Sequence, residues 1–252
     1  MKNSRLATTF IAAVAMSGLV MLGCSAMNIS SLHQYPFLSL LVIAALASRM
    51  KVKLPGLDGN MSVNLPFILI AAAQLSWFEA VTVALVSAAA QSVPKFGAEP
   101  GAKFQPVKML FNVSTMVLAA GVSALLLHSG WLANATQRFG AVPLVAACAM
   151  FFLVNTLPVA AIISLTEGSH LLRIWSSIFH LSFPYYVACT GVTSIVTAMS
   201  QHLGWQMPLV ILPVMLLMYR CYRLYFGSTP ELQRFGPVSP SADLKAKAAG
   251  AN

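Results

Sequence analysis

The sequence predicts an all-α fold, a polytopic transmembrane bundle of about eight helices, and two observations support this prediction. Apolar residues make up 58% of the 252 positions, and charged residues make up only 8%. A soluble domain carries roughly a quarter charged residues, so this chain could not cover a water-facing surface. The second observation is a series of apolar segments whose lengths suit a hydrocarbon core roughly 30 Å thick.

Eight apolar segments can be drawn, and each is expected to form a helix. Their approximate boundaries are 6–24, 36–50, 62–77, 79–93, 106–128, 142–165, 175–200 and 207–226. The segments 106–128 and 142–165 are long enough to span a bilayer with some tilt. The chain therefore divides into a transmembrane domain over 1–226 and a tail over 227–252.

The first segment also has features of a cleavable signal. Lys2 and Arg5 precede the apolar run, and Met21-Leu22-Gly23-Cys24 loosely resembles a lipoprotein cleavage box. Such a box normally has Leu three residues before the Cys and a small residue two before it, which is not the case here. We expect the segment to be retained, and a cleaved chain would have seven spans.

The stretch 51–66, KVKLPGLDGNMSVNLP, is predicted to be the loop before the third segment. Pro55-Gly56 and Asp58-Gly59-Asn60 are turn-forming sequences. Ser62 is the expected N-terminal cap of the next helix. Pro66 would then fall in or near the first helical turn, where its missing N–H costs least.

The stretch 62–93 is too long for one span. Polar residues between Gln74 and Glu79 interrupt it, which predicts two short helices joined by a tight turn. These helices form either a hairpin that crosses the membrane twice or a re-entrant pair that enters and leaves on one side. Both arrangements return the chain to the side of the membrane from which it started. The sequence leaves both open.

The distribution of Lys and Arg predicts the orientation. With a cytoplasmic N-terminus and eight crossings, 14 of the 15 basic residues face the cytoplasm, and only Arg138 faces outward. This asymmetry follows the positive-inside rule and favours a bacterial inner-membrane protein with both termini in the cytoplasm. The basic residues then lie near anionic lipid headgroups. No separate basic domain with interleaved aromatic residues exists, so nucleic acid is not an expected partner.

The last segment ends in an interfacial pattern. Tyr219, Tyr222 and Tyr225 recur every three residues, with Arg220 and Arg223 between them, as is typical of a helix end at the headgroup level. From Gly227 onward Pro, Ser, Gly, Ala and Lys dominate, which predicts a disordered cytoplasmic tail.

Several short stretches resemble a family of bacterial membrane proteins. They are KVKLPGLDGNMSVN at 51–64, Glu79, Phe111-Asn112, Asn155-Thr156, Tyr185-Tyr186, Gly204-Trp205 and Tyr219-Arg220. Together they are similar to the multi-pass input region that precedes diguanylate cyclase or HD-type phosphodiesterase domains in cyclic-di-GMP signalling proteins. The resemblance implies a sensory module. No cyclase or phosphodiesterase signature follows here, so such a module would act through a membrane or cytoplasmic signalling partner.

Polar residues inside the predicted spans are the candidate functional residues. Asn155 lies about 15 Å from the cytoplasmic end of its helix at 1.5 Å per residue, and Tyr185 and Tyr186 lie at a similar depth in the next helix. Pro158 and Pro184 accompany them and free carbonyl groups. These side chains are predicted either to bond neighbouring helices or to line a pocket for a small, mostly apolar ligand.

A second set of polar residues lies nearer the ends of the spans. Asn64, Gln91 and Asn112 fall near the cytoplasmic ends, where interhelical hydrogen bonding is the expected role. Glu79 is expected at a water-exposed turn on the outer side, at the level of His33, His128 and His202. These four residues have no metal-ligand spacing, and no metal site is expected.

The sequence contains no nucleophile–base pair, HExxH motif or Gly-rich phosphate loop, so neither enzymatic activity nor a cofactor is expected. Two functions are favoured over a membrane enzyme or a structural partner. The first is a sensor of an unknown small ligand in the inner membrane. The alternative is a small-molecule permease with a midplane site, since Val63-Asn64-Leu65-Pro66 and Val154-Asn155-Thr156-Leu157-Pro158 are alike on oppositely directed helices.

Overall fold

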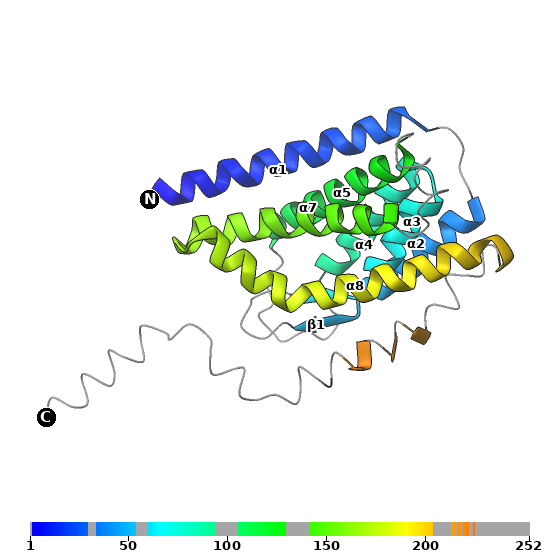
Figure 1. The fold of residues 1–252 in the computed structure, drawn as a ribbon. Coiled ribbons are helices and arrows are strands. Elements are labelled where there is room, and N and C mark those ends of the chain that lie inside the picture. The colour runs from blue at the N-terminus through cyan, green and yellow to red at the C-terminus, as the bar shows by residue number, and fades with distance from the viewer. Residues whose placement is uncertain are drawn as a thin grey trace, which may run out of the picture.

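The computed structural model describes residues 2–29, 34–53, 60–93, 105–129, 142–203 and scattered positions between 213 and 224. The elements are helices, apart from two short strands (Figure 1). In chain order they are α1 (Lys2–Met27), α2 (Gln34–Ser48), β1 (Lys51–Lys53), β2 (Asn60–Ser62), α3 (Leu65–Gln74), α4 (Trp77–Ser92), α5 (Pro106–His128), α7 (Val142–Glu167) and α8 (Leu171–Leu203).

The first seven predicted segments correspond to these helices. The segment 106–128 has the same bounds as α5, and the stretch 62–93 divides into α3 and α4 as predicted. Within the described residues, α1 from Arg5, α5 and α7 are long and apolar enough to cross a membrane. The last segment, 207–226, lies mostly outside the described residues, and the predicted tail, 227–252, lies wholly outside them.

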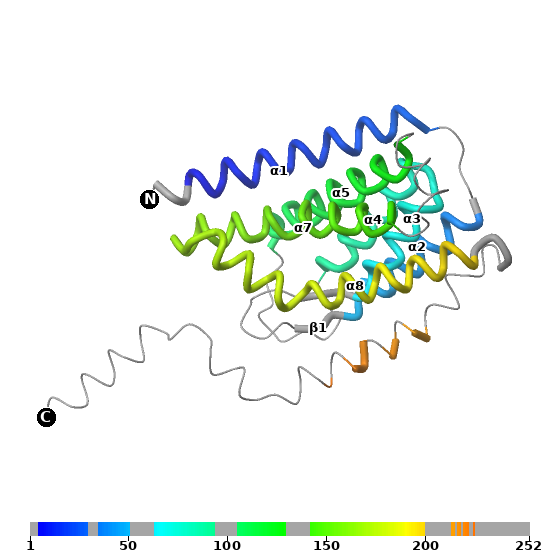
Figure 2. The backbone as a smooth tube through the Cα atoms, viewed as in Figure 1, coloured from blue at the N-terminus to red at the C-terminus, as the bar shows by residue number. Residues whose placement is uncertain are grey.

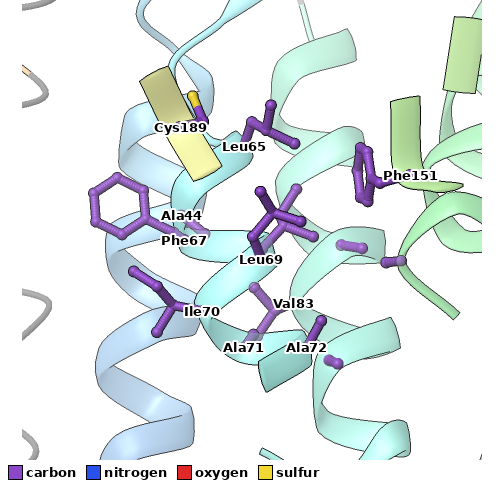
Figure 3. Packing of buried hydrophobic residues seen from close by; sticks show 14 of the residues in the cluster. Ala44, Leu65, Phe67, Leu69, Ile70, Ala71, Ala72, Val83, Phe151 and Cys189 are labelled. Atoms are coloured by element: carbon purple, nitrogen blue, oxygen red, sulfur yellow. The ribbon is translucent and has the colours of Figure 1, made fainter. Parts of the chain in front are cut away.

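The short helix α3 lies at the centre of the bundle. Every residue from Leu65 to Ala72 is buried, because α3 packs against α2, α4, α5 and α8. Figure 3 shows this packing, with Ile70 toward α2, Val83 of α4 close to α3, and Cys189 of α8 beside Leu65. At 1.5 Å per residue, these ten residues are about 15 Å long, which is half the thickness of a hydrocarbon core.

Helix α1 covers one side of the bundle and runs in the same direction as α5 (Figure 2). Phe10 lies against Phe111, with ring centroids 6.4 Å apart, and Gly18 lies against Ser114 further along both helices. The small residues Gly18 and Ser114 let the two backbones approach closely, as in many membrane helix pairs.

The strands β1 and β2 form an antiparallel hairpin between α2 and α3, with Lys51 opposite Ser62 and Lys53 opposite Asn60. Ser62 therefore belongs to a strand, and its predicted role as a helix cap is wrong. The cap position is Asn64, which makes no capping bond with its side chain, while Pro66 lies in the first turn as predicted. The predicted turn residues between 54 and 59 lie outside the described residues.

Candidate functional site

Helices α7 and α8 form an antiparallel pair joined by three residues. Gly168 in this connection has a φ of 71°, a left-handed conformation that glycine adopts without steric cost. The hydroxyl of Ser164 donates to the carbonyl of Ser169 over 2.6 Å and closes the turn. A short connection of this kind favours antiparallel packing of the helices it joins.

A hydrogen bond joins two of the predicted pocket residues across this pair. The amide Nδ2 of Asn155 donates to the hydroxyl oxygen of Tyr186 over 2.9 Å. Asn155 is half-buried, and Tyr186 is 7% exposed. Pro158 lies inside α7 and Pro184 inside α8, close to this contact in sequence. The structure thus brings together two of the three predicted pocket residues.

Tyr185 faces a different neighbour. It is 4% exposed, and its hydroxyl lies beside the backbone of Leu65 in α3 and the thiol of Cys189. Successive residues of a helix point about 100° apart, so two adjacent tyrosines cannot both face α7. The sequence put Asn155 at a similar depth to both tyrosines, and in the structure Tyr186 is the one bonded to Asn155.

An aromatic cluster surrounds the Asn155–Tyr186 bond. Phe152 is its centre, with the ring of Tyr186 at 4.8 Å and that of Phe179 at 5.6 Å, both edge to face. Phe179 also stacks on Phe183, with ring centroids 4.6 Å apart. Such pairs are worth about 0.5–1.5 kcal/mol each beyond the area they bury. The cluster gives this pair of helices a well-packed, largely apolar seam.

A second hydrogen bond on this seam was not predicted. The indole Nε1 of Trp175 donates to the hydroxyl of Thr156 over 3.2 Å, and this hydroxyl donates to the carbonyl of Phe152. The sequence signal was available, because a Trp in a membrane helix usually finds an acceptor for its N–H. The pairing itself depends on how α7 and α8 meet.

Asn64 and Asn112 make the interhelical contacts predicted near the helix ends. Asn64 donates to Ser87 over 3.2 Å, which links the start of α3 to α4, and Asn112 of α5 lies 3.5 Å from Ser92 of α4. Gln91 is half-buried in α4.

Arg49 makes a contact that the sequence did not indicate. Its Nη1 donates to the carbonyls of Ala90 and Val93, over 3.0 and 3.1 Å. These carbonyls belong to the last turn of α4 and the residue after it, where a helix leaves acceptors without an internal partner. A cation there also complements the helix dipole. Arg49 therefore joins the end of α2 to the end of α4.

Glu79 lies in the first turn of α4 and is completely buried. Its carboxylate accepts from the backbone N–H of Ser76 over 2.9 Å and from the Ser76 hydroxyl over 2.8 Å, forming a capping box. The prediction that Glu79 follows a turn is confirmed, whereas the expected exposure to water is wrong. The capping bonds and the helix N-terminus stabilise the carboxylate in its buried position.

Among the residues the structure describes, no group of three or more His, Cys, Asp or Glu side chains is placed to hold a metal. His128 is exposed at the end of α5. His33 lies outside the described residues, and the surroundings of the His202 side chain are also undescribed.

The structure thus defines a class: a membrane protein built as a helical bundle around an apolar core. Residues 9–225 match the family model MASE9. This match covers most of the chain, and the chain belongs to the MASE9 family. MASE families are membrane-associated sensory domains of signalling proteins. No curated protein and no solved structure matches the chain.

Proposed function

We propose that this chain is a signal-input module of the bacterial inner membrane that binds a small molecule and acts through a signalling partner. The family match over residues 9–225 is the observation that carries this proposal, because it includes nearly all the helices and assigns them to a sensory family. A catalytic role is not part of the proposal. The partner we propose is a cyclic-di-GMP enzyme or a histidine kinase.

The proposed topology has eight spans, with both termini in the cytoplasm. Eight spans require successive helices to run in opposite directions, and contacts between helix ends support this arrangement. Arg49 joins the end of α2 to the end of α4, and Asn112 places the start of α5 there as well. The parallel packing of α1 and α5 adds the start of α1 to the same end. The basic residues of these segments then collect on one face, as the positive-inside rule requires.

The first helix is proposed to remain in the mature protein. The family match includes α1 from residue 9, and α1 packs closely on α5 through Gly18. A signal peptide that is removed would have no reason to fit the mature bundle in this way. Intact mass measurement of the purified protein tests this, and a mass lacking residues 1–23 would contradict retention.

The seam between α7 and α8 is the proposed place where a ligand is detected. Asn155 and Tyr186 bond each other there, between two proline-containing helices and beside the Phe152 cluster. A small ligand that competes for either polar group would change how these helices pack. The pair is equally suited to holding the helices together, and mutation separates the two roles.

The test is mass spectrometry of the protein purified in mild detergent after crosslinking in cells. We expect a co-purified small molecule together with a cyclic-di-GMP enzyme or a histidine kinase. Asn155→Ala should reduce the small molecule, whereas Thr166→Ala should not, because Thr166 bonds only its own helix on an exposed surface. Recovery of transport components, without a signalling enzyme, would contradict the sensory role.

A permease is the second candidate, and the shape of α3 favours it. Discontinuous helices that end inside the membrane are common at transporter binding sites, and α3 has only ten residues. Uptake of the recovered molecule by proteoliposomes containing the purified protein distinguishes the two. A sensor would bind it without accumulation, and a permease would accumulate it.

A further inference from the structure

Three buried polar atoms of α3, α4 and α8 have no hydrogen-bond partner among the described residues. They are Nε2 of Gln74, Nε1 of Trp77 and Oγ1 of Thr193. Gln74 ends α3 and Trp77 begins α4, so a turn of only two residues separates them. Thr193 belongs to α8 and is completely buried. Buried polar groups in proteins are almost always bonded, so such a concentration is informative.

Counted from the contact between Tyr185 and Leu65, with α3 and α8 running in the same direction, Thr193 comes to about the level of this turn. Cys189 and Tyr185 lie beside Leu65 at the start of α3, as Figure 3 shows for Cys189. Thr193 follows Cys189 by four residues and therefore shares its face of α8. It lies about 12 Å beyond Tyr185 along α8, and Gln74 lies about 14 Å beyond Leu65 along α3, at 1.5 Å per residue.

Thr193 differs from Thr190, Thr115 and Thr156, three other buried threonines of the bundle. Thr190, one turn away, donates to the carbonyl of Tyr186 in its own helix over 2.8 Å. Thr115 and Thr156 do the same with the carbonyls of Phe111 and Phe152. This local bond is the usual solution for a threonine in a helix. The hydroxyl of Thr193 makes no such bond.

The chemistry of the three groups defines the kind of ligand. An amide N–H and an indole N–H donate only, and a hydroxyl can also donate, so the ligand must present acceptor oxygens. The buried Glu79 carboxylate in the first turn of α4 disfavours a second negative charge there. The neighbouring side chains Leu75 and Val196 are apolar and buried. These conditions suit a neutral, mostly apolar molecule with carbonyl or ether oxygens.

We propose that the α3–α4 turn and the facing part of α8 form a binding site for such a carbonyl-bearing molecule, held by Gln74, Trp77 and Thr193. This site is separate from the Asn155–Tyr186 seam. The proposal specifies the class of ligand that the sensory module would detect, and it rests on the proposed sensory function. Binding can be measured without any signalling partner, so failure of the site and failure of the sensory role are distinguishable.

The probe for the test is benzophenone, an apolar aromatic ketone that crosslinks to nearby C–H groups under light. The full-length protein in lipid nanodiscs is labelled, digested and mapped by mass spectrometry. We expect preferential labelling of the peptides around residues 74–77 and 193. Thr193→Val and Trp77→Phe should each lower that labelling about fivefold, the factor expected for loss of one neutral hydrogen bond.

Thr190→Val is the matched control, because its hydroxyl is already bonded within α8. Its labelling should equal that of the wild type. A thermal melt provides a second readout, in which benzophenone should raise the Tm of the wild type and of Thr190→Val but not of Thr193→Val. Uniform labelling of all lipid-facing helices would overturn the proposal. Local labelling that does not change in Thr193→Val or Trp77→Phe would also overturn it.

Discussion

Replacing Gly18 with Ala should separate α1 from α5. A Cβ built at Gly18 would lie 2.8 Å from Cβ and 3.0 Å from Cα of Ser114, whereas ordinary contacts begin at 3.4 Å. The helices must therefore move apart by about 0.6 Å or more at this point, because a backbone atom cannot rotate away. Overpacking of this kind costs about 1–3 kcal/mol of unfolding free energy.

Gly23→Ala is the matched control. Gly23 lies on the same helix, and a Cβ there would meet no described atom within 4 Å. Its replacement by Ala brings only the gain in helix propensity, up to about 1 kcal/mol. The stability of Gly121→Ala should lie between those of Gly18→Ala and Gly23→Ala, because its Cβ would meet the flexible side chain of Met21 at 2.6 Å.

The assay is the unfolding free energy from a sodium dodecyl sulfate titration of the three variants and the wild type in mixed micelles. Gly18→Ala should be less stable than Gly23→Ala by about 1–3 kcal/mol, since the difference isolates the steric clash from propensity. Equal stabilities of these two variants would refute the close α1–α5 packing. They would also remove the structural support for retention of α1.

Three further predictions concern other parts of the chain. In a double-mutant cycle, Asn155→Ala and Tyr186→Phe should couple by about 0.6–1.7 kcal/mol in the same titration, and zero coupling would contradict their hydrogen bond. Ser76→Ala should lower stability by about 1 kcal/mol through loss of the capping box, unlike the exposed control Ser17→Ala. Deletion of 230–252 should leave the titration midpoint unchanged, and a clear decrease would show that the predicted tail docks.

The helices were predictable because the apolar segments are long and their boundaries carry local signals. Pro106 begins α5 where it was predicted, and the polar residues after Gln74 divide α3 from α4. Burial of Glu79 was not predictable, because whether a turn faces water depends on the helices around it. The expected cap at Ser62 failed for a related reason, since pairing with Lys51 in the β-hairpin gave its backbone another role.

The sequence predicted which polar residues form the candidate site, but it did not predict which of them bond each other. Asn155, Tyr185 and Tyr186 were recognisable from the sequence as polar groups at one depth. Which tyrosine meets Asn155 depends on the rotation of α8 about its axis, which the sequence alone does not specify. The unpartnered hydroxyl of Thr193 was also missed. A threonine in a helix is expected to bond its own backbone, so its sequence carries no sign of the exception.

Hydrogen bonds join neighbouring helices at several places in the bundle. Arg49 links α2 to α4, Ser123 of α5 donates to a carbonyl of α7 over 3.0 Å, and Asn155 links α7 to α8. In a membrane such bonds hold helices together because lipid offers no other partner. The region between the α3–α4 turn and α8 differs, since Gln74, Trp77 and Thr193 contribute donors to no such link among the described residues. Burying these three donors without a partner costs desolvation free energy. A bound ligand with acceptor oxygens would offset that cost.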